Sequence, residues 1–143
     1  MTVRAHREWL EQLMQTLGER IVVLDGAMGA MIQSYELGED AFRGERFQNH
    51  RVDLRGNNDV LNLTCPHLIE EIHREFLLAG ADIIQTNTFN STTISQADYQ
   101  TADLAYDLNF QGAKLALQAI WEAKQLQPER EMFVAGVLGP TNR

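Results

Sequence analysis

Three apolar runs of this sequence each end in small or polar residues that could bind a ligand. The endings read "LDG" at Leu24–Gly26, "QTNTFN" at Gln85–Asn90 and "GPTN" at Gly139–Asn142. A carboxylate can bind a cationic group, and amide and hydroxyl groups can hydrogen-bond a polar ligand. Turns also use Gly, Asn and Thr for backbone reasons alone. The recurrence of the pattern at three places, with Asp25 directly after the first run, favours a binding site.

The elements that must position these residues alternate between strands and helices. Each strand is short and apolar, and each helix carries apolar residues every three or four positions. Parallel pairing with helical crossovers follows, because short hairpin turns are missing between the strands. Parallel strands share one carboxyl end, where ligands bind in open α/β sheets and in (β/α)8 barrels. The pattern predicts a helix over 3–17, strands near 21–25, 82–87 and 132–138, and helices over 66–79 and 97–124, with a long irregular segment over 35–63.

Other familiar chemistries are not supported. The run "GAMGAM" at Gly26–Met31 lacks the first glycine of a dinucleotide fingerprint, and Asp25 would repel a pyrophosphate. The four histidines have no common metal-ligand spacing, so they are interpreted as surface or structural residues. Cys65 precedes a predicted helix without a partner thiol or imidazole nearby, and it is interpreted as a small residue before a helix.

The composition is that of a folded protein with an acidic surface. The 143 residues carry a net charge of −8, with 44% hydrophobic residues. An acidic surface is not attracted to nucleic acid or to anionic membranes. One cysteine cannot form an internal disulfide, and the charged amphipathic start does not resemble a signal peptide. We therefore expect a cytoplasmic protein that has neither nucleic acid nor a membrane as a partner.

Five longer motifs carry a resemblance to a known family. They read "LDGAMGAMIQSYEL", "FRGERF", "LRGNNDVLNLTCP", "EFLLAGADIIQTNTFNSTTISQADY" and "VAGVLGPTNR". Together they resemble the amino-terminal homocysteine-binding domain of the cobalamin-dependent methionine synthases, from about Arg20 to Arg143. The resemblance implies a (β/α)8 barrel in which homocysteine binds zinc as a thiolate and receives a methyl group from methylcobalamin. Its partners would be downstream folate-binding and cobalamin-binding modules of the same polypeptide.

The resemblance also assigns roles to the residues at the strand ends. It implies that Asp25 faces the amino group of homocysteine and that Gly26 lets the ligand approach the backbone. Thr86 and Asn87 would hydrogen-bond the amino-acid moiety. Gly139 and Asn142 would line the neighbouring turn. The family commonly has glycine where Ala27 stands. This departure bears on how tight the turn after the first strand is, and not on membership of the family.

Two features of the family are missing from the sequence. Its zinc is held by three cysteines of later barrel strands, and this chain has only Cys65. About three parallel strands are predicted, whereas a closed barrel has eight. We therefore expect an α/β fold that is the amino-terminal part of a TIM barrel, residues 1–143 forming an incomplete homocysteine-binding domain. No catalytic residue and no metal ligand is predicted within it, and the piece alone is expected to be inactive.

Two alternatives remain open at this stage. The first is a homocysteine methyltransferase that uses betaine or S-methylmethionine as methyl donor. The long matches "SYELGEDAFRGERF" and "RGNNDVLNL" speak against it. The second belongs to another class, a small binding module with no catalytic role.

Overall fold

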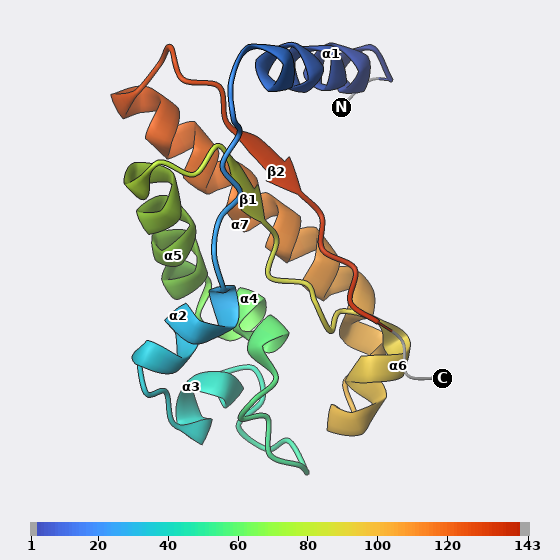
Figure 1. Ribbon diagram of the computed structural model, residues 1–143. Helices are drawn as coiled ribbons and strands as arrows, with labels where there is room; N and C mark the ends of the chain where they lie inside the picture. Colours follow the sequence, from blue (N-terminus) through green and yellow to red (C-terminus); the bar gives the residue numbers. More distant parts are fainter. Residues whose placement is uncertain (1–2, 141–143) are drawn as a thin grey trace.

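The computed structural model describes residues 3–140 as a helix-rich α/β fold around a small parallel sheet (Figure 1). The strands are β1 (Ile83–Gln85) and β2 (Phe133–Ala135). The helices are α1 (Val3–Glu19), α2 (Met28–Ser34), α3 (Glu39–Arg43), α4 (Leu61–Thr64), α5 (Pro66–Ala79), α6 (Thr93–Gln96) and α7 (Ala105–Leu126), with 3-10 turns η1 (Asn58–Val60), η2 (Ala97–Tyr99) and η3 (Ala102–Leu104). None of the described helices is both long enough and apolar enough to cross a membrane.

The two strands pair in parallel, and the segment before α2 adds one bridge on the other side of β1. Ile83 pairs with Phe133, and Gln85 pairs with Ala135. The connection between β1 and β2 runs through α7, as parallel pairing requires. The expected parallel arrangement of strands and helices is therefore present, with shorter strands than the sequence predicts.

The expected strand over 21–25 is reduced to a single parallel bridge between Leu24 and Ile83. The main-chain N–H of Asp25 donates to the carbonyl of Ile83 at 2.8 Å, as in a continuing ladder. The next donor, the N–H of Gln85, goes instead to the Asp25 carboxylate at 2.8 Å. Because a side-chain oxygen replaces the main-chain acceptor, the ladder ends at Asp25.

The other end of this short ladder is also closed by an aspartate. The Asp82 carboxylate accepts the N–H of Val23 at 2.9 Å. Two arginines neutralise it: Arg20 makes bonds of 2.7 and 2.9 Å to its two oxygens, and Arg130 lies 3.5 Å away. The bond from Arg20 is the main cause that lowers the pKa of this buried carboxyl. Asp82 thus stays charged and ties the amino ends of the strands together.

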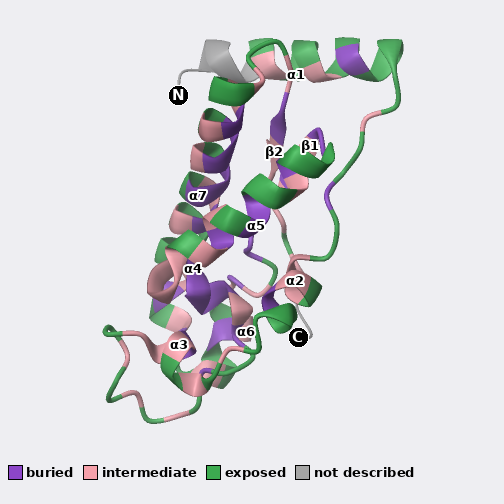
Figure 2. Ribbon diagram, turned by 90° about the vertical axis from the view of Figure 1, so that its left-hand side faces the viewer, coloured by how far each residue is buried: buried purple, intermediate pink, exposed green. Residues whose placement is uncertain are grey.

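Helices α5 and α7 pack side by side and cover one face of the sheet (Figure 1). Proline is suited to the first turn of α5, and Gly80 ends this helix with a φ of +115°. The core between the two helices and the strands contains Leu77, Ala81, Ile84, Ala116, Ala119, Ile120, Ala123 and Met132. Figure 2 shows the buried residues gathered along these elements, while much of α1 is exposed.

Helix α7 begins at Ala105 rather than near residue 97, where the sequence predicts it. The 3-10 turns η2 and η3 occupy the difference. Between them Gln100 has a φ of +56°, and the N–H of Thr101 donates to the carbonyl of Gln96 at 3.0 Å. A left-handed residue interrupts the helical repeat, which the apolar spacing does not reveal.

Gly112 brings α7 unusually close to the segment that follows β1. A Cβ at this position would lie 2.6 Å from Cγ2 of Thr88 and 3.0 Å from Nδ2 of Asn62. Both distances are shorter than ordinary packing allows, so only glycine fits without a shift. Glycine is a poor helix former, and close packing accounts for its presence here.

Helix α1 lies across the amino ends of the strands (Figure 1). Trp9 packs edge-on against Phe133, with the ring centroids 5.6 Å apart. The neighbouring Leu10, Met14 and Leu17 are more exposed than Trp9. The helix is thus attached to the sheet by part of its apolar surface.

The segment over 35–63, expected to be irregular, contains α3, η1 and the first residues of α4. The Glu39 carboxylate organises it by accepting the main-chain N–H groups of Leu54 and Arg55 at 2.8 and 2.7 Å. Arg43 pairs with the same carboxylate at 2.6 Å. One side chain thereby holds the two ends of the connection between α3 and η1 together.

His73 is fully buried in α5, and neither of its ring nitrogens has a hydrogen-bond partner. Burial favours the neutral ring and lowers the pKa of His73 from 6.5 to about 4. An unpartnered buried polar group costs about 1–3 kcal/mol of stability. His73 is thus a buried, structural histidine, one of the two kinds that the sequence analysis expects.

We predict that His73 makes the protein less stable as the pH falls from 6.5 to about 4. The unfolded chain takes up a proton on this ring below pH 6.5, whereas the folded chain does so only near pH 4, so protons favour unfolding. The shift corresponds to about 3 kcal/mol. His73→Leu should be the more stable protein at pH 7 by about 1 kcal/mol. It should also lose this part of the pH dependence.

Urea unfolding of both proteins between pH 4 and 8 measures the effect. The difference between them isolates His73 from the carboxyl groups that titrate in the same range. His67→Leu is the matched control, because the side chain of His67 is 97% exposed. Equal pH dependence in the wild type and His73→Leu would contradict the prediction.

Candidate functional site

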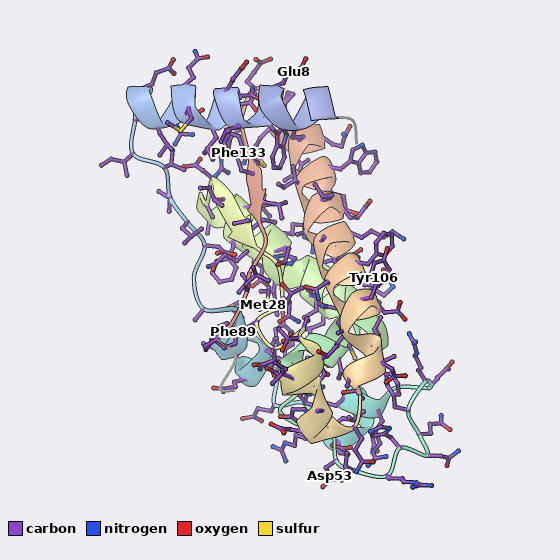
Figure 3. The ribbon with its side chains drawn as sticks, turned by 90° about the vertical axis from the view of Figure 1, so that its right-hand side faces the viewer. Glu8, Met28, Asp53, Phe89, Tyr106 and Phe133 are labelled. Carbon is purple, nitrogen blue, oxygen red and sulfur yellow. The ribbon has the colours of Figure 1, made fainter. Side chains whose placement is uncertain are left out.

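The candidate site lies at the carboxyl ends of the strands, away from α1. Figure 3 shows Phe133 directly beneath α1, and it shows Met28, at the start of α2, and Phe89, beyond β1, farther from α1. The predicted residues Asp25, Gly26, Thr86, Asn87 and Gly139 all follow a strand or bridge at this end. Asn142 lies outside the described residues.

Asp25 is a buried carboxylate, 9% exposed, with one hydrogen-bond donor on each oxygen. Oδ2 accepts the main-chain N–H of Gln85 at 2.8 Å, and Oδ1 accepts the side-chain Nε2 of the same residue at 2.9 Å. No arginine, lysine or histidine of the described residues forms an ion pair with it. A carboxylate offers about four acceptor positions, so Asp25 can accept further donors, including those of a cation.

Gly26 follows Asp25, and its missing side chain serves packing within the protein. A Cβ there would lie 3.1 Å from Cε1 of Phe76, on α5. This close contact explains why a residue without a side chain is favoured at position 26. A close approach of the ligand to its backbone stays a prediction.

Thr86 joins the first two strand ends to the third. Its Oγ1 accepts the N–H of Val137 at 3.0 Å and lies 2.7 Å from Oγ1 of Thr88. Thr88 in turn donates to the carbonyl of Val137 at 2.9 Å. The residue after β1 and the segment after β2 are therefore held together, with Asp25 bonded to the preceding residue, Gln85.

The Asn87 side chain is bonded to η1 and α4. Its Nδ2 donates to the carbonyl of Asn58 at 2.8 Å and to Oδ1 of Asn62 at 3.1 Å. Asn62 completes the link by donating to the carbonyls of Asn87 and Leu108 at 2.8 and 3.2 Å. The side chain is 95% buried in this network, so its observed role is to support the segment after β1.

Asp59 fixes the next part of the same segment. Its Oδ2 accepts the N–H of Asn90 at 2.8 Å and the hydroxyl of Ser91 at 2.6 Å. Burial raises the pKa of Asp59, and the two hydrogen bonds oppose that effect. Together with Asn62 and Asn87, this aspartate makes a buried polar layer beneath the strand ends.

Gly139 packs directly against the main chain of Phe89. A Cβ at this position would overlap the carbonyl oxygen of Phe89, which leaves room for glycine only. A hollow of about 250 Å³ lies beside this contact, lined by Phe89, Asn90, Ile94, Ser95, Asp98, Tyr99 and Pro140. Of the predicted substrate residues that the structure describes, none lines that hollow.

Comparison with known proteins identifies the family. The sequence profile described as homocysteine S-methyltransferase matches residues 22–143, most of the chain. The chain belongs to the homocysteine S-methyltransferase family.

Solved structures of homocysteine methyltransferase MmuM from Escherichia coli have a similar fold. The metallated form is 21% identical, with a TM-score of 0.69 over 88% of this chain and 40% of that protein. The oxidized form is 22% identical, with a TM-score of 0.66 over 87% and 39%. The chain thus spans about 40% of the length of these structures. It matches part of their TIM-barrel fold, and within residues 3–140 no closed barrel is formed.

The described part of this homocysteine S-methyltransferase chain does not offer a zinc site. Among the side chains that the structure describes, no three of the His, Cys, Asp and Glu types come close enough to hold a metal ion. Cys65 lies between α4 and α5, where its thiol is 3.5 Å from the carbonyl of Ala41. Zinc sites of thiolate type need several soft ligands around one point, and these residues do not fit that requirement.

Sequence reasoning missed Gln85 and Asn62 as parts of the site. Gln85 begins the polar ending "QTNTFN" of the second apolar run, but the sequence assigns it no role of its own. A strand that ends in a long amide next to an aspartate-terminated strand is the signal that could have identified it. Asn62 lies in the segment expected to be irregular, where no periodicity shows which way its side chain points.

We predict that Gly139→Ala lowers the free energy of unfolding by about 1–3 kcal/mol, because the new methyl group forces the main chain of Phe89 to move. Gly136→Ala is the matched control, since nothing lies within 4 Å of a Cβ there. It should change stability by less than about 0.5 kcal/mol. Chemical denaturation of the three proteins measures both effects, and equal stability of the two variants would refute the packing argument.

Proposed function

We propose that this chain binds the amino-acid end of homocysteine in a larger homocysteine S-methyltransferase. The observation that carries the proposal is Asp25, a buried carboxylate at the carboxyl edge of the sheet with no cationic partner in the described residues. The α-ammonium group of homocysteine supplies the missing positive charge. Family membership and the motifs around Asp25 support this choice of ligand.

The proposed binding residues contact the amino-acid end of homocysteine, and its thiol end is bound by another part of the enzyme. Asp25 contacts the amino group, and Gly26 lies beside the ligand. Thr86, Asn87 and Gly139 form or support the surrounding turns, and Asn142 is proposed as a further residue that lines the ligand. The thiol end of homocysteine would reach zinc ligands supplied from outside the described residues.

Methylcobalamin is the methyl donor in this proposal, as in the cobalamin-dependent methionine synthases. The support is the sequence resemblance of "SYELGEDAFRGERF" and "RGNNDVLNL", which form the segment around α3 and η1. The proposal extends to partner modules that bind folate and cobalamin, and to a cytoplasmic location.

We predict that Asp25→Asn weakens homocysteine binding by about ten- to a hundredfold, because a hydrogen bond to a charged group contributes about 1.5–3 kcal/mol. The substitution keeps the shape of the side chain and removes its charge. Asp53→Asn is the control for net charge, since the Asp53 side chain is 87% exposed. Isothermal titration of the full-length protein with homocysteine measures the affinities. Unchanged affinity in Asp25→Asn rules out this role for the carboxylate.

The methyl donor is tested separately by turnover. We expect the full-length protein to form methionine from homocysteine with methylcobalamin and to form none with betaine or S-methylmethionine. Activity with either of the latter two overturns the donor assignment. Homocysteine binding without turnover on any of the three donors would instead support a non-catalytic binding module.

A further inference from the structure

Gln85 occupies a special place as the last residue of β1. The preceding Ile84 is fully buried in the core formed with α5 and α7. Because successive side chains of a strand point to opposite faces, Gln85 points to the face away from these helices. Its carboxamide therefore lies outside the helix-facing core, at the same edge as Asp25.

The contact between Gln85 and Asp25 fixes the carboxylate at both oxygens. The main-chain N–H holds Oδ2 at 2.8 Å, and the side-chain Nε2 holds Oδ1 at 2.9 Å. The carboxylate torsion of an aspartate has broad, soft minima, so a single donor leaves the plane of the group free to turn. Two donors from one residue set that plane.

Gln85 does this without neutralising the charge. Asp82, at the other end of the same ladder, is held by Arg20 and Arg130, which satisfy both its hydrogen bonding and its charge. A carboxamide satisfies only the hydrogen bonding. The orientation of Asp25 is therefore fixed while its negative charge stays available.

We propose that Gln85 is a positioning residue that orients Asp25 towards the ammonium group of the substrate. This inference rests on the proposed function of Asp25. It assigns to Gln85 a part in selecting α-amino thiols over thiols that lack the amino group, since only the former present a cation to the oriented carboxylate.

The test compares two ligands in two variants of the full-length protein. Homocysteine and 4-mercaptobutanoate have the same carbon chain, thiol and carboxylate, and only homocysteine has the amino group. Gln85→Met keeps the length of the side chain and the main-chain N–H, and it removes the side-chain donor. Homocysteine affinity should fall about tenfold, the effect of one hydrogen bond to a charged group, whereas the affinity for 4-mercaptobutanoate should not change.

Gln48→Met is the matched control, because Gln48 is exposed in the connection after α3. It should leave both affinities unchanged. Should Gln85→Met fail to fold, Gln85→Asn provides a second variant, whose amide is one methylene too short to reach Oδ1. Its expected loss is the same, and calorimetric titration with a thermal melt of each protein measures all of these effects.

The outcomes separate this inference from the proposed function. An equal loss of affinity for both ligands would mean that Gln85 only supports the fold, and unchanged homocysteine affinity would mean that it has no part in binding. Either result overturns the positioning role while a weakened Asp25→Asn variant still supports the function of Asp25. Unchanged binding in Asp25→Asn overturns the proposed function itself.

Discussion

The structure depends on two aspartates that close a very short ladder between the segment before α2 and β1. Asp82 accepts the N–H of Val23 at one end, and Asp25 accepts the N–H of Gln85 at the other. Main-chain bonds between them leave only Leu24 and Ile83 as a bridged pair. Because side chains replace the main-chain acceptors, the chain can leave the sheet immediately on both sides. Because the acceptor for the N–H of Gln85 is the Asp25 side chain, a carboxylate rather than a main-chain carbonyl stands at the carboxyl edge of the sheet.

A buried polar layer then gives the segment after β1 a defined shape. Irregular backbone away from water must find hydrogen-bond partners, and here Asn62 and Asp59 supply them to the carbonyl of Asn87 and the N–H of Asn90. Asn62 also reaches the carbonyl of Leu108 on α7, which is possible because Gly112 lets this helix come close. The position of the strand ends is thereby coupled to the packing of α7. A helix-forming residue at position 112 would gain local propensity and lose this contact.

The sequence predicts best those features that depend on local chemistry or on a regular repeat. The bounds of α5 follow from Pro66 and Gly80, and the parallel arrangement follows from the alternation of strands and helices. The strand over 21–25 is predicted too long at its amino end, because an apolar run cannot show that the Asp82 side chain takes over the ladder bond at Val23. The orientation of Asn87 is missed for a related reason, since the alternation of a strand no longer applies beyond its end. Of the predicted site, the convergence of the strand ends could be read from the sequence, but the division between ligand-facing and supporting side chains required the three-dimensional contacts.

The three buried aspartates of the described residues show how the same side chain can serve different purposes. Asp82 is balanced by two arginines, and Asp59 accepts a hydroxyl and an N–H in a site where burial raises its pKa. Asp25 is oriented by two neutral donors, the main-chain N–H and the side-chain amide of Gln85. A ligand with an ammonium group would give Asp25 the charge balance that Arg20 and Arg130 give Asp82. In the proposed enzyme, this arrangement separates recognition of the amino acid, at the first strands, from activation of its thiol by a metal held elsewhere.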